Sequence, residues 1–243
     1  MYLENIVFDA LDPQALGRFW ETALGTETLT DEVEGFETRL SVSGGPVLDL
    51  CFPRVPKPTA EPPQRLRLDL QGSGDRQRLV DRLLALGAGH ADVAAGQRQG
   101  HGPSTVLGDP EGNRFGLVPE RASVEGVVRL ATMSLEVADP RRDRDFWSWL
   151  TGWLPVEGSE VGLRHSSGRG PLLELSAETE PKGSGKNRVH VDVRLEPGDD
   201  ADAVAQEIAQ RGGRELHPGW GDLPWRIFAD PSGNEFCVLP KLG

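Results

Sequence analysis

The sequence predicts an α+β protein that consists of two similar halves. Two stretches, 109–118 and 230–239, share the pattern Asp-Pro, one variable residue, Gly-Asn and then alternating apolar residues. Proline fixes φ at the second turn position and glycine tolerates positive φ, so each stretch indicates a tight turn that leads into a half-buried strand. Because each copy closes about half of the chain, the pattern indicates an internal repeat.

A second repeat lies near the start of each half. Asp12 and Asp139 each precede a proline, as expected of a helix N-cap followed by the first helical residue. A Phe-Trp pair follows each at the same distance on the apolar stripe of the predicted helix, which favours core packing for Trp20 and Trp147. We therefore predict two homologous halves, at 1–121 and 130–243, joined by a linker at 122–129.

Within each half, a unit of strand, helix and further strands occurs twice. In the first half we expect strands at 5–10, 39–42, 47–52, 65–70, 90–93 and 104–107, and helices after Asp12 and at about 75–86. In the second half we expect strands at 132–137, 161–164, 172–176, 188–195, 214–217 and 225–229, and helices after Asp139 and at about 200–210. Linkers at 53–63 and 178–186 separate the two units of each half.

Length and charge exclude several classes of function. The chain has 243 residues, enough for one large or two small domains with proper cores, and its formal net charge of −12 disfavours nucleic-acid binding. No apolar run is long enough to cross a membrane, the residues after Met1 do not begin a signal peptide, and two cysteines do not make a disulfide framework. We therefore expect a soluble cytoplasmic protein without nucleic-acid or membrane partners.

These repeats resemble the vicinal oxygen chelate superfamily, which includes glyoxalase I, extradiol dioxygenases and bleomycin-resistance proteins. The resemblance rests on the doubled unit, on the Asp-Pro-x-Gly-Asn turns, and on the motifs Asn-Arg-Val-His-Val-Asp at 187–192 and Gly-Asn-Glu-Phe-Cys-Val at 233–238, which are similar to the glyoxalase-like subgroup. It covers nearly the whole chain. It implies a tandem glyoxalase/bleomycin-resistance/dioxygenase fold, in which paired βαβββ modules form cupped mixed sheets with helices outside. Because this fold hosts many activities, the resemblance is specific for fold and weak for function.

Alternation along the strands predicts which side chains face the inside of a cup. Apolar residues take the helix side and leave polar residues inside. In the first half these polar residues include Asp49 and Arg65. In the second half they are Glu136, Glu174, Arg188, His190, Asp192 and Glu235. A lining that is only solvated or salt-bridged and a polar ligand pocket are both open interpretations.

The resemblance also implies four positions at which metal-dependent relatives carry ligands. Carried over to this chain, the first half offers Asn5, Asp49, Arg65 and Gly116, and the second half offers Thr132, Glu174, Arg188 and Cys237. Arginine has no lone pair to give and glycine has no side chain, so we predict no metal at these positions and no cofactor. This argues against glyoxalase I and extradiol dioxygenase chemistry, which need a metal. A shifted site built from Glu136, Glu174, His190 and Glu235 stays open.

An acid and an arginine occupy ligand positions in both halves, as Asp49 with Arg65 and as Glu174 with Arg188. Either each pair is an internal ion pair, or the arginine binds a carboxylate or phosphate of a ligand in a bidentate manner.

The second half is predicted to carry the better ligand site, with Arg188 and His190 as its polar anchors. Trp220 and Trp225 lie in a Pro/Gly-rich loop before the final hairpin, where a tryptophan at the rim of a cup can stack on a planar ligand. Cys237 and Cys51 are interpreted as small buried thiols, because no Cys–His spacing supports a nucleophile.

Three functions fit these observations. The favoured one is a metal-independent protein of resistance or sequestration type, which binds a small organic ligand that is anionic or planar. The alternatives are a lyase or isomerase of glyoxalase type with a nonstandard site, and a protein-interaction or regulatory module with a vestigial cup. The sequence does not decide whether the protein is an enzyme, or whether modules pair within a half, across halves or between chains. A homodimer is therefore possible.

Overall fold

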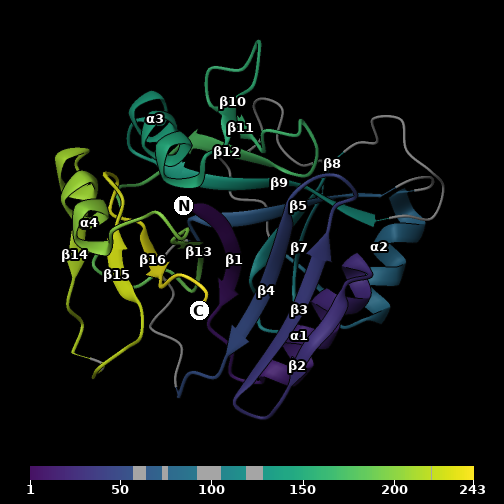
Figure 1. Ribbon diagram of the computed structural model, residues 1–243. Coiled ribbons are helices and arrows are strands. Elements are labelled where there is room, and N and C mark those ends of the chain that lie inside the picture. The colour runs from purple at the N-terminus through teal and green to yellow at the C-terminus, as the bar shows by residue number, and fades with distance from the viewer. Residues whose placement is uncertain (57–63, 73–75, 92–104, 119–127, 220) are drawn as a thin grey trace.

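The computed structural model describes residues 1–56, 64–72, 76–91, 105–118, 128–219 and 221–243 (Figure 1). These residues form four βαβββ modules, as the sequence predicts. The first module comprises β1 (Tyr2–Phe8), α1 (Pro13–Leu24), β2 (Glu27–Asp31), β3 (Gly35–Ser41) and β4 (Val47–Pro53). The second comprises β5 (Leu66–Gly72), α2 (Arg76–Ala85), β6 (Gly89–His90), β7 (Thr105–Gly108) and β8 (Arg114–Val118).

The second half repeats this order of elements. The third module comprises β9 (Val128–Val137), α3 (Pro140–Thr151), β10 (Leu154–Pro155), β11 (Gly162–Arg164) and β12 (Leu172–Ala177). The fourth comprises β13 (Val189–Arg194), α4 (Ala201–Gln210), β14 (Arg214–Leu216), β15 (Arg226–Ala229) and β16 (Glu235–Leu239). Strand β9 begins inside the linker expected at 122–129, and the earlier part of that linker lies outside the described residues.

The modules pair across the two halves into two eight-stranded mixed sheets. The first sheet has the strand order β14-β15-β16-β13-β1-β4-β3-β2, and the second has the order β10-β11-β12-β9-β5-β8-β7-β6. The seams are antiparallel, with Ile6 opposite Val191 between β1 and β13, and Leu68 opposite Met133 between β5 and β9. The first sheet therefore joins the two ends of the chain, and purple and yellow strands lie together in Figure 1.

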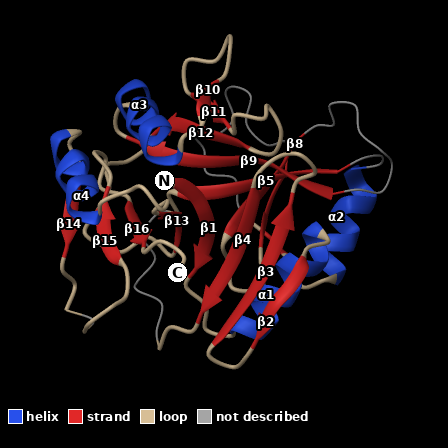
Figure 2. Ribbon diagram, in the orientation of Figure 1, coloured by secondary structure: helices blue, strands red, loops and turns tan. Residues whose placement is uncertain are grey.

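Both sheets bury their apolar face in one continuous hydrophobic core. Strand residues such as Ile6, Leu50, Met133 and Phe236 are fully buried there. Helix α1 contacts β3 and β4 of the first sheet and β9 of the second, so the helices cover the backs of the sheets (Figure 2). The opposite, helix-free faces are called the first cup and the second cup here. The alternation along the strands thus assigns the faces as predicted.

The Asp-Pro-x-Gly-Asn turns are fixed by buried hydrogen bonds. Asp109 accepts the backbone N–H groups of Glu111 and Asn113, and its other oxygen accepts the indole N–H of Trp20 at 3.0 Å. Asp230 has the equivalent role and accepts the indole N–H of Trp147 at 3.1 Å. The glycine of each turn has positive φ, which only glycine adopts at low cost. Both tryptophans are therefore core residues that hold the turns, as the helix stripe indicated.

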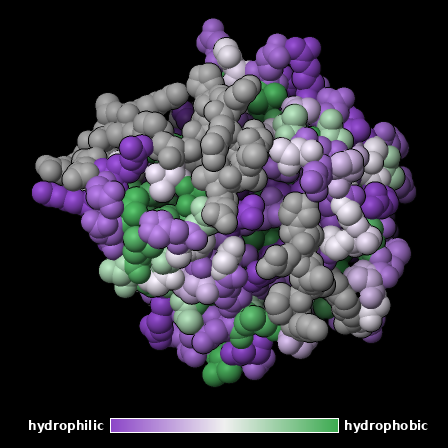
Figure 3. Space-filling view, turned by 180° about the vertical axis from the view of Figure 1, so that it is seen from behind, coloured by the Kyte–Doolittle hydropathy of each residue, from purple (hydrophilic) through white to green (hydrophobic). Residues whose placement is uncertain are grey.

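Polar and apolar residues are mixed on the face seen in Figure 3. Figure 3 shows hydrophobic residues in a few separate groups on the face seen from behind. Among the described residues, no helix combines the length and apolar character needed to cross a membrane.

Candidate functional site

The floor of the first cup is formed by four adjacent strands, β4, β1, β13 and β16. Strand register places Asn5 beside both Asp49 and Asp192, and Asp192 beside Cys237. Two residues further along β1, Val7 lies beside Cys51 and His190. These side chains share the face that points away from the helices, because they alternate with fully buried core residues.

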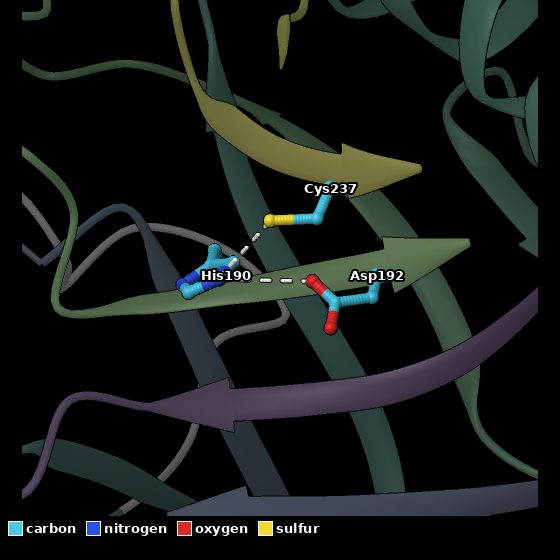
Figure 4. Close-up of side chains that lie close together, drawn as sticks. All are labelled: His190, Asp192 and Cys237. Atoms are coloured by element: carbon cyan, nitrogen blue, oxygen red, sulfur yellow. Dashed lines mark hydrogen bonds and ion pairs between the residues drawn. The ribbon is translucent and has the colours of Figure 1, made fainter. Parts of the chain in front are cut away.

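His190, Asp192 and Cys237 form a compact group, called the central cluster here, at the middle of this floor (Figure 4). His190 Nε2 lies 3.7 Å from Asp192 Oδ1 and 4.0 Å from Cys237 Sγ. All three residues are less than a tenth exposed. Two strands therefore bring an imidazole, a carboxyl and a thiol together at the centre of the helix-free face.

Burial sets the protonation state of the central cluster. It raises the pKa of Asp192 to about 6, against a stabilising hydrogen bond from the Asn5 amide at 3.1 Å. It also holds the pKa of His190 well below its usual value, and the positive charge of Lys186 adds to this effect. At neutral pH the imidazole is therefore neutral, and the 3.7 Å contact with Asp192 is not an ion pair.

Two polar atoms of the central cluster have no hydrogen-bond partner in the described structure, His190 Nδ1 and Asp192 Oδ1. Buried polar atoms are nearly always partnered, and each orphan costs free energy unless a water or a ligand satisfies it. The floor of the first cup therefore offers at least two unmet hydrogen-bonding positions.

The two thiols of the chain do not provide a nucleophile. Burial raises the pKa of Cys237, and the neighbouring Asp192 carboxylate raises it further. Burial likewise raises the pKa of Cys51, with a further contribution from Glu37. Cys237 and Asp192 also face the same nitrogen of His190, whereas a catalytic relay needs both ring nitrogens. The thiols are thus in the unreactive state that the sequence favoured.

Basic side chains around the first cup are already paired with carboxylates. Arg39 forms a bidentate pair with Asp49, with N–O distances of 2.8 and 2.7 Å. Arg194 contacts Glu4. A third pair, Lys186 with Asp9, has an N–O distance of 2.6 Å. The prediction that Asp49 pairs with Arg65 is therefore wrong. Arg39 lies directly opposite Asp49 on the adjacent strand β3 and forms the ion pair instead.

An apolar wall stands beside the central cluster. It consists of the buried side chains of Ile227 and Leu239, which pack with Cys237 and are covered by the half-buried Leu216 and Leu223. Trp225, in the loop that carries Leu223, is 38% exposed. Trp220, the other tryptophan predicted at the rim, lies outside the described residues. The first cup thus combines an acidic floor with an apolar side.

Arg65 lies in the interface between halves and not in a cup. Its side chain is fully buried, pairs with Glu178 at 2.7 Å, and donates to Asn234 of the second-half turn at 3.0 Å. Arg188, at the equivalent strand start of the other half, contacts Glu111 of the first-half turn at 3.1 Å. The predicted pairing of Arg188 with Glu174 is therefore wrong. Each arginine instead joins its sheet to the turn of the other half.

The second cup contains the remaining predicted residues. Glu174 on β12 lies beside Ser134, in a different sheet from His190. Burial raises the pKa of Glu136, which also lies on this sheet. Glu235 belongs to the first sheet, where it pairs with Lys182 at 3.1 Å. The open set of Glu136, Glu174, His190 and Glu235 is thus divided between the two sheets, and it is not a group of close metal-ligating atoms among the described residues.

The same pairing regroups the positions that the resemblance implied for a metal. The first sheet combines Asn5 and Asp49 with Arg188 and Cys237, whereas the second combines Thr132 and Glu174 with Arg65 and Gly116. Asn5 is engaged by Asp192, Asp49 by Arg39, and the arginines cannot ligate. These positions do not fit a metal. The central cluster is the one group of three described residues whose donor atoms, all within 4.8 Å of one another, suit a metal such as Zn²⁺.

Comparison with known proteins agrees with this architecture. The sequence profile of the glyoxalase-like domain matches residues 5–118 and 132–239. The chain belongs to the glyoxalase-like domain family. This family membership places it in the vicinal oxygen chelate superfamily, as the two motifs and the turns indicated.

This glyoxalase-like chain is similar to one curated protein in sequence and to several solved structures in fold. "Glyoxalase 1" of Caenorhabditis briggsae is 25% identical over 145 residues, 56% of this chain and 49% of that protein, so the chain spans about half the length of this relative. A mutant of glyoxalase I from Zea mays has a TM-score of 0.62 at 16% identity, over 98% of this chain and 92% of that one. A putative dioxygenase from Bacillus subtilis has a TM-score of 0.58 at 16% identity, over 100% and 86%. These structures support the fold alone.

Proposed function

We propose that this glyoxalase-like protein binds a small organic molecule in the first cup without a metal, and that it acts by holding this molecule. The pair of unpartnered buried atoms in the central cluster carries the proposal. Ligand sites are concave, largely apolar and contain a few convergent polar groups. The first cup has this composition, with Asn5, His190 and Asp192 beside the apolar wall.

Binding without conversion is favoured by what surrounds the central cluster. The thiols have raised pKa values, and the imidazole shares one nitrogen between its two neighbours. Cys237 Sγ lies 4.0 Å from His190 Nε2, but burial raises the pKa of the thiol, so this pair does not present an activated nucleophile. At the implied metal positions of the first cup, Asp49 is held by Arg39, and Asn5 is an amide that donates to Asp192.

A screen of metabolites and antibiotics by thermal shift, with protein treated with a chelator, tests the proposal. We expect at least one compound to stabilise the fold, because a ligand at a hundred times its Kd adds about 2.7 kcal/mol. The double variant His190→Ala, Asp192→Ala should lose the response, whereas the second-cup control Glu174→Gln should keep it. A hit that is lost only in Glu174→Gln, or that is recovered chemically changed, contradicts the proposal.

A lyase or isomerase of glyoxalase type is the second candidate, and the central cluster favours it. His190, Asp192 and Cys237 are the residues that would hold a metal ion, which would supply Lewis-acid polarisation of a substrate oxygen. Elemental analysis of protein purified without chelator separates the two candidates. Near-stoichiometric metal that disappears in His190→Ala supports the enzyme, and the absence of such metal supports the binding protein.

A further inference from the structure

We propose that the first cup selects organic cations, in which an ammonium or amidinium group donates to Asp192 while the apolar part of the ligand lies against the apolar wall. This inference rests on the proposed binding function and names the chemical class of the ligand. It replaces the anionic ligand that the sequence suggested, because Arg188 is held by Glu111 and does not contribute a cation to the cup.

The balance of charge around the first cup favours a cation. Each of Arg39, Arg194 and Lys186 already has its own carboxylate partner. Asp192 and Glu37 have no lysine or arginine within ion-pair distance among the described residues. Glu37 lies opposite Cys51 on the same face and accepts a hydrogen bond from Thr30. The cup therefore has carboxylate charge in excess of its cations.

Asp192 provides the directional contact for a cation. Its Oδ2 is occupied by the Asn5 amide, and its Oδ1 is the buried atom without a partner. An ammonium or amidinium N–H that reached Oδ1 would form a charge-assisted hydrogen bond, which is about twice as strong as a neutral one. His190 adds a second hydrogen-bonding position beside Asp192, because its unpartnered Nδ1 can accept or donate.

The apolar wall favours an organic cation over a bare metal ion. Leu216 and Leu223 are half-buried where they pack against Ile227, Cys237 and Leu239, so they keep part of their apolar surface exposed. Strand register places Ile227 beside Cys237 and Cys237 beside Asp192. Removal of this surface from water would contribute roughly 25 cal/mol per Å² to binding. A metal ion makes no use of such a wall. An aromatic or aliphatic amine uses both the wall and the acid.

Three probes with the same body and different charge test the inference. Phenethylamine, 2-phenylethanol and phenylacetate are titrated at pH 8 into the full chain treated with chelator, and binding is followed by NMR shifts of the labelled protein. We expect the amine to bind at least ten times more tightly than the alcohol, and the acid to bind most weakly. Asp192→Asn should reduce the ratio of the affinity for the amine to the affinity for the alcohol to about one.

Two further variants locate and check the effect. Glu37→Gln should reduce the preference for the amine by a smaller factor than Asp192→Asn does, because Glu37 is exposed. Glu174→Gln, in the second cup, should leave the preference unchanged. A preference that disappears in Glu174→Gln but survives in Asp192→Asn overturns the inference.

The other outcomes separate this inference from the proposed function. If the alcohol or the acid binds in the first cup as tightly as the amine, cation selection is wrong while small-molecule binding stands. If no probe binds, cation selection is again wrong, and the proposed function is decided by its own compound screen. If Zn²⁺ binds at micromolar concentration, is lost in Asp192→Asn and excludes the amine, the central cluster is a metal site and the inference fails.

Discussion

The two cups differ in whether the aspartate at one equivalent position has an arginine partner. Asp192 on β13 and Asp69 on β5 occupy equivalent positions, each beside the last strand of its module. Two residues earlier, the first cup has His190 and the second has Arg67. Arg67 forms a bidentate pair with Asp69, with N–O distances of 2.8 and 3.2 Å. Asp192 has no such partner, and its Oδ1 is unsatisfied.

This difference shows how one module supports a closed and an open site. In a strand, residues two apart lie on the same face. The side chain two positions before the aspartate therefore decides whether the carboxylate has an ion-pair partner within the protein. An arginine closes the pair, as in the second cup. A buried histidine that stays neutral leaves the acid available for a ligand, as in the first cup.

The largest expected effect comes from the arginines that start the equivalent strands. Arg65→Ala removes a fully buried guanidinium and leaves Glu178 and Asn234 without it, so we expect a loss of about 4 kcal/mol in the free energy of unfolding. Arg188→Ala should cost about 1–2 kcal/mol, because this side chain is 19% exposed. Urea denaturation of both variants measures the difference, and equal losses would contradict the unequal burial.

Stability should fall as pH rises through the pKa of Asp192. Burial raises this pKa in the folded chain to about 6, from an ordinary value of 3.8. The folded state therefore keeps a proton that the unfolded chain has lost, and the stabilisation is fully present below about pH 4 and lost above about pH 6. Asp192→Asn mimics the protonated acid, so it should be up to about 3 kcal/mol more stable than wild type at pH 7.

The control for this pH effect is Asp230, whose pKa burial also raises to about 6. Asp230 accepts four donors from Trp147, Ser232 and Asn234, which an amide cannot all satisfy. Asp230→Asn should therefore destabilise the fold. Denaturation curves between pH 4 and 8 measure both variants. If Asp192→Asn is destabilising at pH 7, the acid already has a partner and the open state of the first cup is refuted.

The same substitution in the second cup should have the opposite sign. Asp69→Asn breaks the pair with Arg67 and leaves a largely buried guanidinium without its carboxylate. We expect a loss of about 2 kcal/mol at pH 7, measured by urea denaturation. A gain in stability would mean that the pair contributes nothing and that the two cups do not differ in this respect.

The smallest effect is expected from exchanging the residue two positions before each aspartate. His190→Arg should pair with Asp192 and close the first cup, which would raise stability at pH 7 by about 1 kcal/mol. It should also lower the pKa of Asp192, as followed by NMR titration of its carboxyl carbon. The reciprocal variant Arg67→His should raise the pKa of Asp69. Unchanged pKa values in both variants would show that the neighbour does not control the acid.

Most of the fold was predictable because its signals are local. The alternation of Ile6 and Phe8 with Asn5 assigns two faces to a strand, and the Asp-Pro turns mark the end of each half. The pairing of modules was not predictable. Nothing in the sequence of β1 identifies β13 as its neighbour in the sheet. Any strand with an apolar face on the same side could pair with β1 equally well.

The candidate site was predicted in part for the same reason. The period of its own strand assigned His190 to the polar face, and the structure groups it there with Asp192 and Cys237 instead of with Glu136 and Glu174. The partners of Asp49, Arg65 and Arg188 were not predicted, because they come from elements whose positions depend on how the modules pair. A local signal for one of them existed, since Arg39 and Asp49 lie on a predicted hairpin where facing charges pair.

The cross-half sheets restrict how a chain of this kind can diverge after duplication of its gene. Each cup takes one module from each copy, so neither copy owns a binding face. Each half of the chain contributes one module to each cup, so a substitution that changes one cup lies in a half that also builds the other cup. A change that specialises the first cup must therefore involve the first and fourth modules together, and one that specialises the second cup must involve the second and third. The repeated segment in the sequence is therefore a half of the chain, whereas each cup is formed by a pair of modules from different halves.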